Sequence, residues 1–565
     1  MNMEENEKDT VESPAEPKDE AADTGSETES KTETESKTES EKGSKDKSRK
    51  KHAKDAEAQK DQKEIKKVKK WKVIVTLVLI FIFTFLTAAV LWALGSWSLL
   101  TMDELLWHLK VSLKGTNPDM IWSFVLICGG SALGATGLAA FLLFIFRKER
   151  KAFRNTCRIS FIMSFVILIV GLVCAWFGLG IGPFLKDYFT VSPYITDNYV
   201  DPGTVMLTFP EKKRNLIVIY MESMEMTFMD EENGGAFPEN VIPELTVLAK
   251  DYEDFSGNSG VRNGGIALPG AIWTMGALFG TTTGLPLKTP MGQNGMSIDD
   301  DFFPGVVNLS DLLKQEGYEN RLIMGSAAGF GGCRHFYESH GDFTIHDYDY
   351  AIDVGLIPED YKVWWGYEDE KVFQYAKDEL PELAAGDKPF QLVIQTMDTH
   401  FEDGHWCRRC TYDFPDNRYA NIMHCSSRMV AEFVHWIQKQ DFYENTTIII
   451  TGDHPTMDKN FCDDVPDTYQ RKTFTCIINS AATPADPDKT REFSTFDLFP
   501  TTLAALGVKI DGERLGLGTN LYSDKPTLIE QNGLQSTTEE ISKHSRLMDD
   551  MYMGRFVSPF FEDSN

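Results

Sequence analysis

An apolar run, Asn215-Leu-Ile-Val-Ile-Tyr-Met221, leads directly into Glu222. A second run, Thr446-Thr-Ile-Ile-Ile-Thr-Gly452, leads in the same way into Asp453 and His454. Short runs rich in β-branched residues are typical of strands that are buried on both faces of a parallel sheet. Because ligand sites in such sheets form at the carboxyl ends of the strands, we expect these three polar residues to meet there.

The residues that follow the two runs form a natural ligand set for a divalent metal ion. Carboxylate oxygens and an imidazole nitrogen bind such ions in proteins. Taken alone, Asp453 and His454 would also fit a turn in which Asp453 caps the next helix. Glu222 would also fit a charge at a helix N-terminus. The pairing favours the metal site, whereas Glu225 is interpreted as a solvated or capping residue.

Short apolar runs alternate with helical stretches from about residue 211 to 525. The predicted strands are Leu216–Tyr220, Arg321–Met324, Gln391–Gln395 and Thr447–Ile450, and the predicted helices include Pro243–Lys250, Asn308–Gly317 and Arg428–Lys439. This alternation predicts a doubly wound α/β domain, placed at residues 213–525. Residues 526–565 form a polar C-terminal extension, in which one further helix is predicted over Thr537–Met553.

The N-terminal region has a different composition. Residues 1 to about 48 consist of Glu, Lys, Ser and Thr with almost no large apolar side chain. Such a segment cannot bury enough surface to offset its ordering entropy, so it is predicted to be disordered. Residues 1–70 are interpreted as an acidic, then Lys-rich, cytoplasmic tail. The net charge of -29 argues against nucleic acid as a partner, because nucleic-acid binders are normally basic.

Three long apolar stretches follow the tail, near residues 73–94, 121–146 and 159–182. Each is long enough to span a bilayer, for which about 20 residues suffice. A basic cluster at residues 147–151 separates the second stretch from the third, and the positive-inside rule places it in the cytoplasm together with the tail. The sequence therefore predicts a multi-pass cell-membrane protein with a cytoplasmic N-terminus. Residues 71–185 form the transmembrane region, residues 186–212 a linker, and the later domain is extracytoplasmic.

Aromatic and sulfur-containing residues allow two further expectations. Trp92, Trp97 and Trp107 are expected in an interfacial belt at the outer membrane surface.

Six of the nine cysteines fall in the predicted outside domain, namely Cys333, Cys407, Cys410, Cys425, Cys462 and Cys476. Disulfides are permitted in an oxidising compartment, but their pairing cannot be read from the sequence. The Cys-x-x-Cys spacing at 407–410 would fit a zinc half-site or a redox pair; a local disulfide or free thiols are preferred because a second such motif is missing.

The other two predicted strands also end in polar residues. The strand at 321–324 is followed by a glycine-rich segment that contains Arg334 and His335, and the strand at 391–395 is followed by Asp398 and His400. If the four strand ends converge, one crevice holds a metal ion, a cation for an anionic substrate and a further imidazole.

Five segments together resemble the alkaline phosphatase and sulfatase superfamily. They are NLIVIYMES, GAIWTMGALFGTTTGLPL, IQTMDTH, TTIIITGDHPTM and STFDLFPTTLAALG, and they lie in family order between about 214 and 523. More narrowly, the chain resembles the membrane-anchored phosphoglycerol transferases, which include the lipoteichoic acid synthases. The resemblance implies an alkaline phosphatase/sulfatase-like sheet domain behind a helical membrane anchor.

The resemblance also implies roles for particular residues. The metal ligands would be Glu222, Thr274, Asp453 and His454. Thr274 would be the nucleophile, and His400 a catalytic residue that also contacts substrate. Arg334 would bind substrate, with an ordinary surface cation as the alternative. Without the resemblance, Thr274 could not be chosen over the run Thr281–Thr283, which more simply forms a turn before glycine.

The activity implied by the resemblance is transfer of phosphoglycerol from phosphatidylglycerol to an extracytoplasmic glycan or glycerophosphate polymer. Diacylglycerol would be released, and a phosphothreonine-type intermediate would form on Thr274. The cofactor would be a divalent metal ion, with Mn²⁺ favoured and Mg²⁺ or Ca²⁺ as alternatives. A membrane anchor suits this chemistry because it brings the domain to the membrane lipid donor at high effective concentration.

Three other functions stay open. The first is a sulfatase-fold hydrolase, either a phosphodiesterase or a sulfuric ester hydrolase; the Cys/Ser-x-Pro-x-Arg motif of sulfatases is missing around Thr274. The second is a phosphoethanolamine transferase, which normally carries additional histidine ligands. The third is a membrane-tethered binding protein without catalysis. A complete set of Glu222, Thr274, Asp453 and His454 argues against a decayed site, because nothing structural requires all of them together.

Overall fold

The computed structural model describes residues 67–291 and 301–561. Residues 1–66 of the predicted disordered tail lie outside the described residues. Contacts divide the chain into two units, and the larger unit consists of Val68–Lys148 and Ala152–Asn565. The domain boundaries that we drew from the sequence remain predictions.

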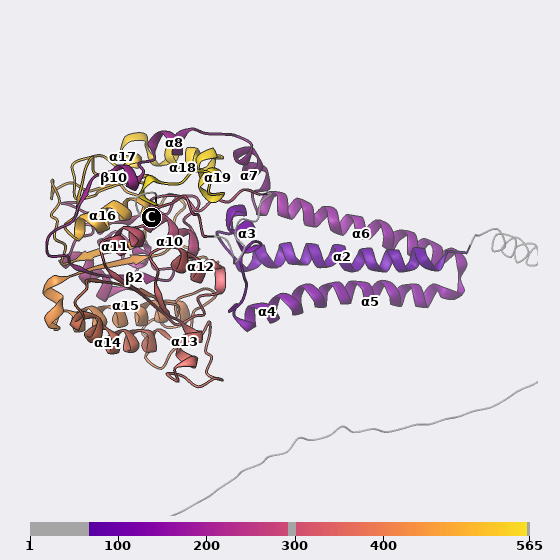
Figure 1. The fold of residues 1–565 in the computed structure, drawn as a ribbon. Helices are drawn as coiled ribbons and strands as arrows, with labels where there is room; N and C mark the ends of the chain where they lie inside the picture. Colours follow the sequence, from indigo (N-terminus) through magenta and orange to yellow (C-terminus); the bar gives the residue numbers. More distant parts are fainter. Residues whose placement is uncertain (1–66, 292–300, 562–565) are drawn as a thin grey trace, which may run out of the picture. The chain divides into compact units, whose positions relative to one another are not determined.

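The larger unit contains a seven-stranded sheet with the strand order β3-β8-β7-β2-β6-β4-β5 (Figure 1). Its strands are β2 (Asn215–Met221), β3 (Gly264–Gly265), β4 (Glu319–Met324), β5 (Thr344–His346), β6 (Phe390–Gln395), β7 (Thr446–Gly452) and β8 (Thr473–Ile478). Neighbouring strands from β7 to β5 are parallel, whereas β8 pairs antiparallel with both β7 and β3. The four predicted strands correspond to β2, β4, β6 and β7.

Strand β2 shows why the central strands are apolar along their whole length. Val218 packs in one hydrophobic core, and its neighbour Ile219 packs in a second. Successive side chains of a strand point to opposite faces, so a strand covered on both faces has no polar side. The prediction of a doubly wound α/β domain is confirmed.

Helices cover both faces of the sheet. One core includes residues of α9 (Pro243–Asp251), α14 (Asp369–Ala385) and α15 (Arg418–Ile437). The other includes residues of α10 (Thr274–Thr283), α11 (Leu309–Gln315), α12 (Cys333–Ser339) and α16 (Leu498–Ala505). Figure 1 shows α14 and α15 on one side of β2, and α10, α11 and α16 on the other. The predicted helices fall on α9, α11 and α15.

Helix α15 begins at Arg418, ten residues before the predicted start at Arg428. Asn417 caps it by accepting a hydrogen bond from the N–H of Ala420. The prediction was wrong about the start because the first half of the helix carries small polar side chains. Ser426 and Ser427 are nevertheless fully buried, so this half also packs against the domain.

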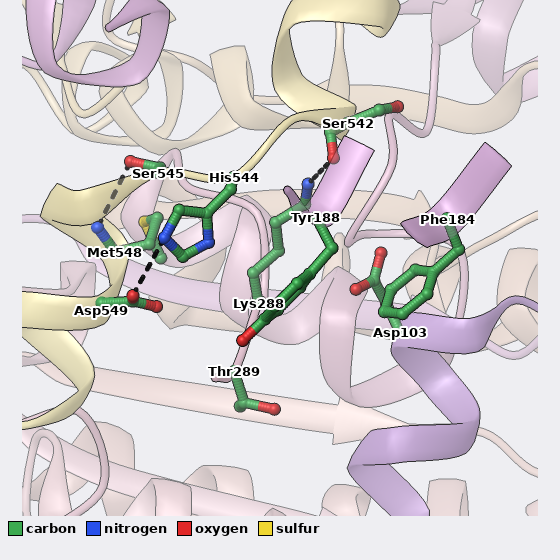
Figure 2. A pocket seen from close by; sticks show the side chains of 10 residues that line it. All are labelled: Asp103, Phe184, Tyr188, Lys288, Thr289, Ser542, His544, Ser545, Met548 and Asp549. Atoms are coloured by element: carbon green, nitrogen blue, oxygen red, sulfur yellow. Dashed lines mark hydrogen bonds and ion pairs between the residues drawn. The ribbon is translucent and has the colours of Figure 1, made fainter. Parts of the chain in front are cut away.

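The C-terminal region contains α17 (Leu528–Asn532), α18 (Leu534–Ser542) and α19 (Arg546–Tyr552). The prediction of a single helix over 537–553 is therefore wrong. The chain breaks between α18 and α19 because the N–H of His544 donates to the carbonyls of Asp187 and Thr190, and Ser545 caps α19. Figure 2 shows the cavity beside this break, in which the Lys288 ammonium donates to the carbonyls of Ile541 and Ser542.

Smaller elements complete the domain. They are two two-stranded sheets, β1 (Leu207–Thr208) with β9 (Lys509–Ile510) and β10 (Arg514–Leu515) with β11 (Gly518–Thr519), and the helices α7 (Ile181–Tyr188), α8 (Tyr194–Asn198) and α13 (Tyr348–Asp353). The side chain of Ile195 in α8 lies in the same core as α10. The predicted linker at residues 186–212 thus contributes to the packing of the domain.

Three helices are long and apolar enough to cross a membrane. They are Lys70–Ser96 (α2), Pro118–Lys148, which includes α4 (Pro118–Phe124) and α5 (Gly130–Ile145), and Arg150–Gly178 (α6). All three overlap the apolar stretches of the sequence, and the third begins at Arg150, nine residues before the predicted start, and ends at Gly178. Their length and composition suit a membrane anchor.

A short helix between the first two spans, α3 (Met102–His108), packs into the domain core. The side chain of Trp107 is 1% exposed, and its indole N–H donates to the carbonyl of Gly331 at 2.9 Å. The expectation that Trp107 lies in an interfacial belt is therefore wrong. The indole N–H is hydrogen-bonded inside the protein, so Trp107 does not depend on lipid headgroups or water for a hydrogen-bond partner.

Candidate active site

The pairing of β2 with β7 brings the first three predicted ligands together. Met221 lies opposite Gly452 in the parallel register, so the next residues, Glu222 and Asp453, leave the sheet side by side. The N–H of Asp453 donates to the carbonyl of Met221 at 3.1 Å. One acidic residue thus follows each of two neighbouring strands at the same sheet edge.

The side chains of Glu222, Asp453 and His454 converge on one point. Their candidate ligand atoms all lie within 4.8 Å of one another. His454 Nε2 is 3.5 Å from Glu222 Oε1 and 3.5 Å from Asp453 Oδ2. All three side chains are almost completely buried. Such a group of two carboxylates and an imidazole can hold a divalent metal ion.

The electrostatics of the two carboxylates fit a cation at this point. The pKa of Glu222 is raised to about 8, mainly by burial and to a smaller extent by the negative charge of Asp453. Asp453 Oδ2 is buried and has no hydrogen-bond partner among the described residues. Buried polar atoms normally have partners, and an orphaned carboxylate oxygen beside a second carboxylate is what a bound cation would satisfy.

The orientation of His454 also fits a metal ligand. Its Nδ1 lies 3.0 Å from the carbonyl oxygen of Pro455, which can only accept a hydrogen bond, so Nδ1 carries the hydrogen. The lone pair of Nε2 then faces the carboxylates, an arrangement typical of metal-binding histidines. Burial opposes the charged imidazole, but the carboxylates of Asp453 and Glu222 outweigh burial and raise the pKa of His454.

Ser223 holds both carboxylates in place, and the sequence analysis missed it. Its N–H donates to Asp453 Oδ1 at 2.8 Å, and its hydroxyl donates to Glu222 Oε1 at 2.9 Å. The backbone of Ser223 has a positive φ of 56°, a strained conformation for a residue other than glycine. The only signal in the sequence was its position between a strand and the next polar residues.

Thr274 is the first residue of α10 and lies over this cluster. Its hydroxyl oxygen is 3.5 Å from Glu222 Oε2 and 3.4 Å from His454 Nε2. The following residues of α10 are buried, whereas Thr274 is half-buried. Free N–H groups at the start of a helix attract phosphate oxygens. The structure therefore brings all four predicted ligands together, with the predicted nucleophile at a helix N-terminus.

The competing threonines occupy the other end of α10. The hydroxyls of Thr281, Thr282 and Thr283 donate back to the carbonyls of the preceding helical turn at 2.7, 2.6 and 2.7 Å. The helix ends at Gly284, which has a φ of 66°. The interpretation of this run as a turn was wrong: its hydroxyls complete the last helical turn, and only the glycine leaves it.

His400 lies in the loop that follows β6, between two aromatic rings. Its ring centroid is 4.6 Å from that of Trp365 and 4.7 Å from that of Phe401. Nδ1 donates to the carbonyl of Phe401 at 2.6 Å, which leaves Nε2 as an acceptor. Burial lowers the pKa of His400 to about 4, and the nearby charge of His454 acts in the same direction. The imidazole is therefore neutral near pH 7.

Trp365 is a second residue that the sequence analysis missed. Its side chain is buried against His400, and its indole N–H has no hydrogen-bond partner among the described residues. An unpaired N–H beside the predicted substrate-contacting histidine is a candidate donor to a substrate oxygen. Trp365 lies outside the strand ends, so no motif pointed to it.

Arg334, the predicted substrate cation, lies at the start of α12. Its Nη2 is 2.6 Å from Asp347 Oδ2, and its Nη1 is 3.4 Å from Glu338 Oε1. Asp347 is fully buried, and it also accepts hydrogen bonds from the N–H groups of Ala328 and Tyr350. Among the described residues, the charged contacts of Arg334 are thus with its own neighbours, and its role in binding substrate remains a prediction.

Glu225 is not solvated, so that interpretation was wrong; it is the N-cap residue of the 3-10 helix Met226–Phe228, although its side chain makes no capping bond. Its side chain is fully buried, and Oε2 accepts a hydrogen bond from Arg471 Nε at 2.9 Å. Oε1 also accepts the N–H of Thr456 at 2.9 Å. This buried ion pair fixes the segment that follows His454.

Comparison with known families identifies the class of this chain. A family model described as Sulfatase matches residues 214–508, which is more than half of the chain and includes Glu222, Thr274, Asp453 and His454. The chain belongs to the sulfatase family. The resemblance inferred from the sequence segments is confirmed.

Individual relatives are more specific. Phosphoglycerol transferase I of Xanthomonas axonopodis pv. citri (strain 306) is 28% identical over 467 residues, which cover 80% of this chain and 62% of that protein. Phosphoglycerol transferase I of Escherichia coli O127:H6 (strain E2348/69 / EPEC) is 29% identical over 368 residues, which cover 63% of this chain and 45% of that protein. This chain thus spans less than two thirds of the length of these relatives.

A solved structure gives a more distant match. The integral membrane lipooligosaccharide phosphoethanolamine transferase A (EptA) from Neisseria meningitidis aligns with a TM-score of 0.44 at 14% identity. The alignment covers 77% of this chain and 84% of that one.

Proposed function

We propose that this protein is a membrane-anchored transferase that moves phosphoglycerol from phosphatidylglycerol to an extracytoplasmic glycan or glycerophosphate polymer. The observation that carries the proposal is the position of the Thr274 hydroxyl, at a helix N-terminus and within 3.5 Å of both Glu222 and His454. The names of the relatives, both phosphoglycerol transferases, support the choice of the transferred group.

A divalent metal ion belongs to this proposal as the cofactor. Glu222, Thr274, Asp453 and His454 would hold it, with Mn²⁺ favoured and Mg²⁺ or Ca²⁺ as alternatives. When bound, such an ion lowers the pKa of a hydroxyl group and polarises a phosphoryl oxygen. The unpaired Asp453 Oδ2 and the two facing carboxylates are the features of this structure that fit it.

In the first step, the Thr274 oxygen attacks the phosphorus of the lipid headgroup. The Thr274 hydroxyl oxygen is 3.5 Å from Glu222 Oε2, which is positioned to accept its proton. The bond between phosphorus and the diacylglycerol oxygen breaks, and diacylglycerol leaves with a proton from solvent. The first N–H groups of α10 face the phosphoryl oxygens and stabilise their charge. A glycerophospho group then remains on Thr274.

In the second step, an acceptor hydroxyl attacks the same phosphorus. His400 is neutral and its Nδ1 donates to the Phe401 carbonyl, so its Nε2 can accept a hydrogen bond from this hydroxyl and orient it. The bond from phosphorus to the Thr274 oxygen breaks, Glu222 returns its proton to that oxygen, and the proton of the acceptor hydroxyl passes to solvent. The unpaired N–H of Trp365 lies beside His400, where it can hold an oxygen of the glycerol or of the acceptor.

The proposed membrane topology brings the sulfatase domain to its lipid donor. The three apolar helices anchor the chain as a multi-pass membrane protein, with the N-terminus in the cytoplasm and the sulfatase domain outside. A domain anchored beside its lipid donor meets that donor at high effective concentration.

The test uses the full chain in detergent with headgroup-labelled phosphatidylglycerol and Mn²⁺. We expect diacylglycerol release and covalent label on the wild-type protein, and neither with Thr274→Ala. Thr274→Ser is the matched control, because it keeps a hydroxyl at the same position and should keep part of both signals. Turnover that persists in Thr274→Ala would refute the covalent mechanism. Release of glycerol phosphate to water without an acceptor would identify a hydrolase, and turnover only with phosphatidylethanolamine would identify a phosphoethanolamine transferase.

A further inference from the structure

Three cysteines outside the active site converge in space. Cys407 and Cys410 lie in the loop between β6 and α15, and Cys425 lies in α15. The Cys407 sulfur is 3.7 Å from the Cys410 sulfur and 3.7 Å from the Cys425 sulfur. All three sulfur atoms lie within 4.8 Å of one another. The Cys-x-x-Cys motif thus acquires a third member that the sequence did not reveal.

The distances between the sulfurs indicate what the cluster does. A disulfide joins its sulfurs at about 2.05 Å, and the three cysteines are free thiols in this structure. Four thiolates around a tetrahedral zinc ion, each about 2.3 Å from the metal, lie about 3.8 Å from one another. The two separations of 3.7 Å are close to the ligand spacing of such a site.

We propose that Cys407, Cys410 and Cys425 form a second metal site, which binds a thiophilic divalent cation such as Zn²⁺ through three sulfur ligands. Soft thiolate ligands select such ions over Mn²⁺, Mg²⁺ or Ca²⁺. The site is therefore separate from the oxygen-rich site of Glu222, Asp453 and His454 both in position and in the metal it prefers.

The surroundings of the sulfurs support thiolate ligands. The N–H of Cys410 donates to the carbonyl of Cys407 at 3.2 Å, which closes the turn of the Cys-x-x-Cys segment. The guanidinium of Arg428 in α15 holds the same turn, because its Nη2 donates to the carbonyl of Arg409 at 3.0 Å. Three thiolates and a divalent cation would carry one net negative charge, and the nearby guanidinium of Arg428, which is also 3.5 Å from Asp413 Oδ2, is a cation that can offset part of it.

The fourth coordination position is open. Among the described residues, no histidine or carboxylate completes a group with all three sulfurs. Cys407 and Cys425 are buried, whereas Cys410 is partly exposed, so solvent reaches the cluster at Cys410 and a water molecule can supply the fourth ligand.

The metal would stabilise one end of the loop that carries His400. The other end is already held, because Asp369 accepts hydrogen bonds from the N–H groups of Met397 and Asp398 at 2.7 and 3.0 Å. Binding at Cys407 and Cys410 would tie the far end of the loop to Cys425 in α15. The site itself does not depend on the activity proposed above.

The test measures metal binding by the full chain in detergent, with Co²⁺ and Zn²⁺ as probes. We expect Co²⁺ to give the sulfur-to-cobalt charge-transfer absorption that a carboxylate and imidazole site cannot give. This band should persist in Asp453→Ala, which lacks a ligand of the first site, and disappear in Cys407→Ser and Cys425→Ser. Zn²⁺ bound per chain should fall in the same two variants. The control is Cys476→Ser, a buried cysteine whose sulfur lies 3.5 Å from the carbonyl oxygen of Leu248.

A further variant separates metal binding from disulfide formation. Cys410→His supplies a nitrogen ligand and removes the Cys407–Cys410 disulfide as an alternative, so it should keep Co²⁺ with a weaker charge-transfer band, and mass spectrometry of this variant should show Cys407 and Cys425 as free thiols. Failure of the wild-type protein to give the band would overturn the proposal. So would a disulfide among the three cysteines in peptide maps of the purified protein, or a band that survives in Cys425→Ser.

Discussion

Ser223 donates a hydrogen bond to each of the two carboxylates of the candidate metal site. Its N–H orients Asp453 and its hydroxyl orients Glu222. Residues that orient metal ligands contribute substantially to affinity, even though they do not touch the metal. The strained backbone at this position places both donors where a relaxed residue would not.

Replacing Ser223 with alanine removes the hydroxyl and leaves the N–H contact. We expect the affinity for Mn²⁺ to fall about 10- to 100-fold, because Glu222 loses the partner that orients it. Equilibrium dialysis of the detergent-solubilised protein measures this. Ser259→Ala is the control, since the Ser259 hydroxyl donates to Val261 in an exposed loop. Equal affinities for the Ser223 variant and the wild type would show that the hydroxyl plays no such part.

His400 makes stability depend on pH in a defined direction. Its pKa is about 4 in the folded protein, below its ordinary value of 6.5, so the unfolded chain binds more protons between these two values. The contribution of His400 to stability is fully present above about pH 6.5 and is lost as the pH falls towards 4. His400→Gln lacks this dependence. We expect the Tm advantage of the wild type over His400→Gln to shrink on acidification across this window, and a constant difference would contradict the burial of a neutral imidazole.

Helix α10 positions Thr274 through close backbone packing. A Cβ atom added at Gly276 would lie 2.6 Å from the carbonyl oxygen of Gly270, so the helix could not keep its place. This contact sits within one turn of the nucleophile. A displacement of the helix start would therefore move the Thr274 hydroxyl away from Glu222 and His454.

We expect Gly276→Ala to lower kcat by about 100-fold, because a displacement of about 1 Å at a reacting group has effects of this size. Transfer assays with saturating lipid donor measure it. Gly137→Ala in α5 is the matched control, since no atom lies within 4 Å of a Cβ added there. An active Gly276→Ala protein would mean that α10 tolerates the shift.

The Glu225–Arg471 ion pair joins the end of β2 to the segment before β8. Both Glu225 oxygens are engaged, and the side chain is fully buried. Glu225→Gln would leave the Arg471 charge without its partner, and we expect a loss of about 3 kcal/mol in the free energy of unfolding. The exposed pair Lys314–Asp342 provides the comparison: Asp342→Asn should change it by less than about 1 kcal/mol. Denaturant titration distinguishes the two, and similar effects would contradict the importance of burial.

Helix α3 and the C-terminal helices show that the domain core extends beyond the segment matched by the family model. Trp107 and Tyr552 lie far outside residues 214–508 in sequence, yet both belong to the core that contains α10. The packing of the domain therefore depends on chain segments from both ends of the described region.

Trp107→Ala tests this dependence. We expect a loss of about 3–5 kcal/mol in stability, because a buried indole and its hydrogen bond to Gly331 are removed. Trp71→Ala should have little effect, since that side chain is 57% exposed. Thermal unfolding in one detergent compares them. Equal melting temperatures would show that α3 packs loosely against the domain.

The fold class could be predicted because its evidence is local. A strand buried on both faces, such as β2 or β7, must be apolar along its whole length, and the pattern is visible in seven consecutive residues. Strand β8 was not predicted because two threonines interrupt its apolar pattern, although all six of its residues are buried. The start of α15 was not predicted for the same reason, since buried serines and a cysteine interrupt the apolar pattern on its buried face.

The sequence by itself determined the strand ends at Glu222, Asp453 and His454, because each of these residues follows directly from an apolar run. Only the tertiary structure decided what surrounds them: the support from Ser223, the unpaired Trp365, the Glu225–Arg471 pair and the meeting of Cys425 with Cys407. These contacts join residues that the chain separates by many positions or that no periodic pattern marks. The local pattern of apolar residues indicates which face of a helix or strand is buried, whereas the residues that contact that face depend on how the elements pack.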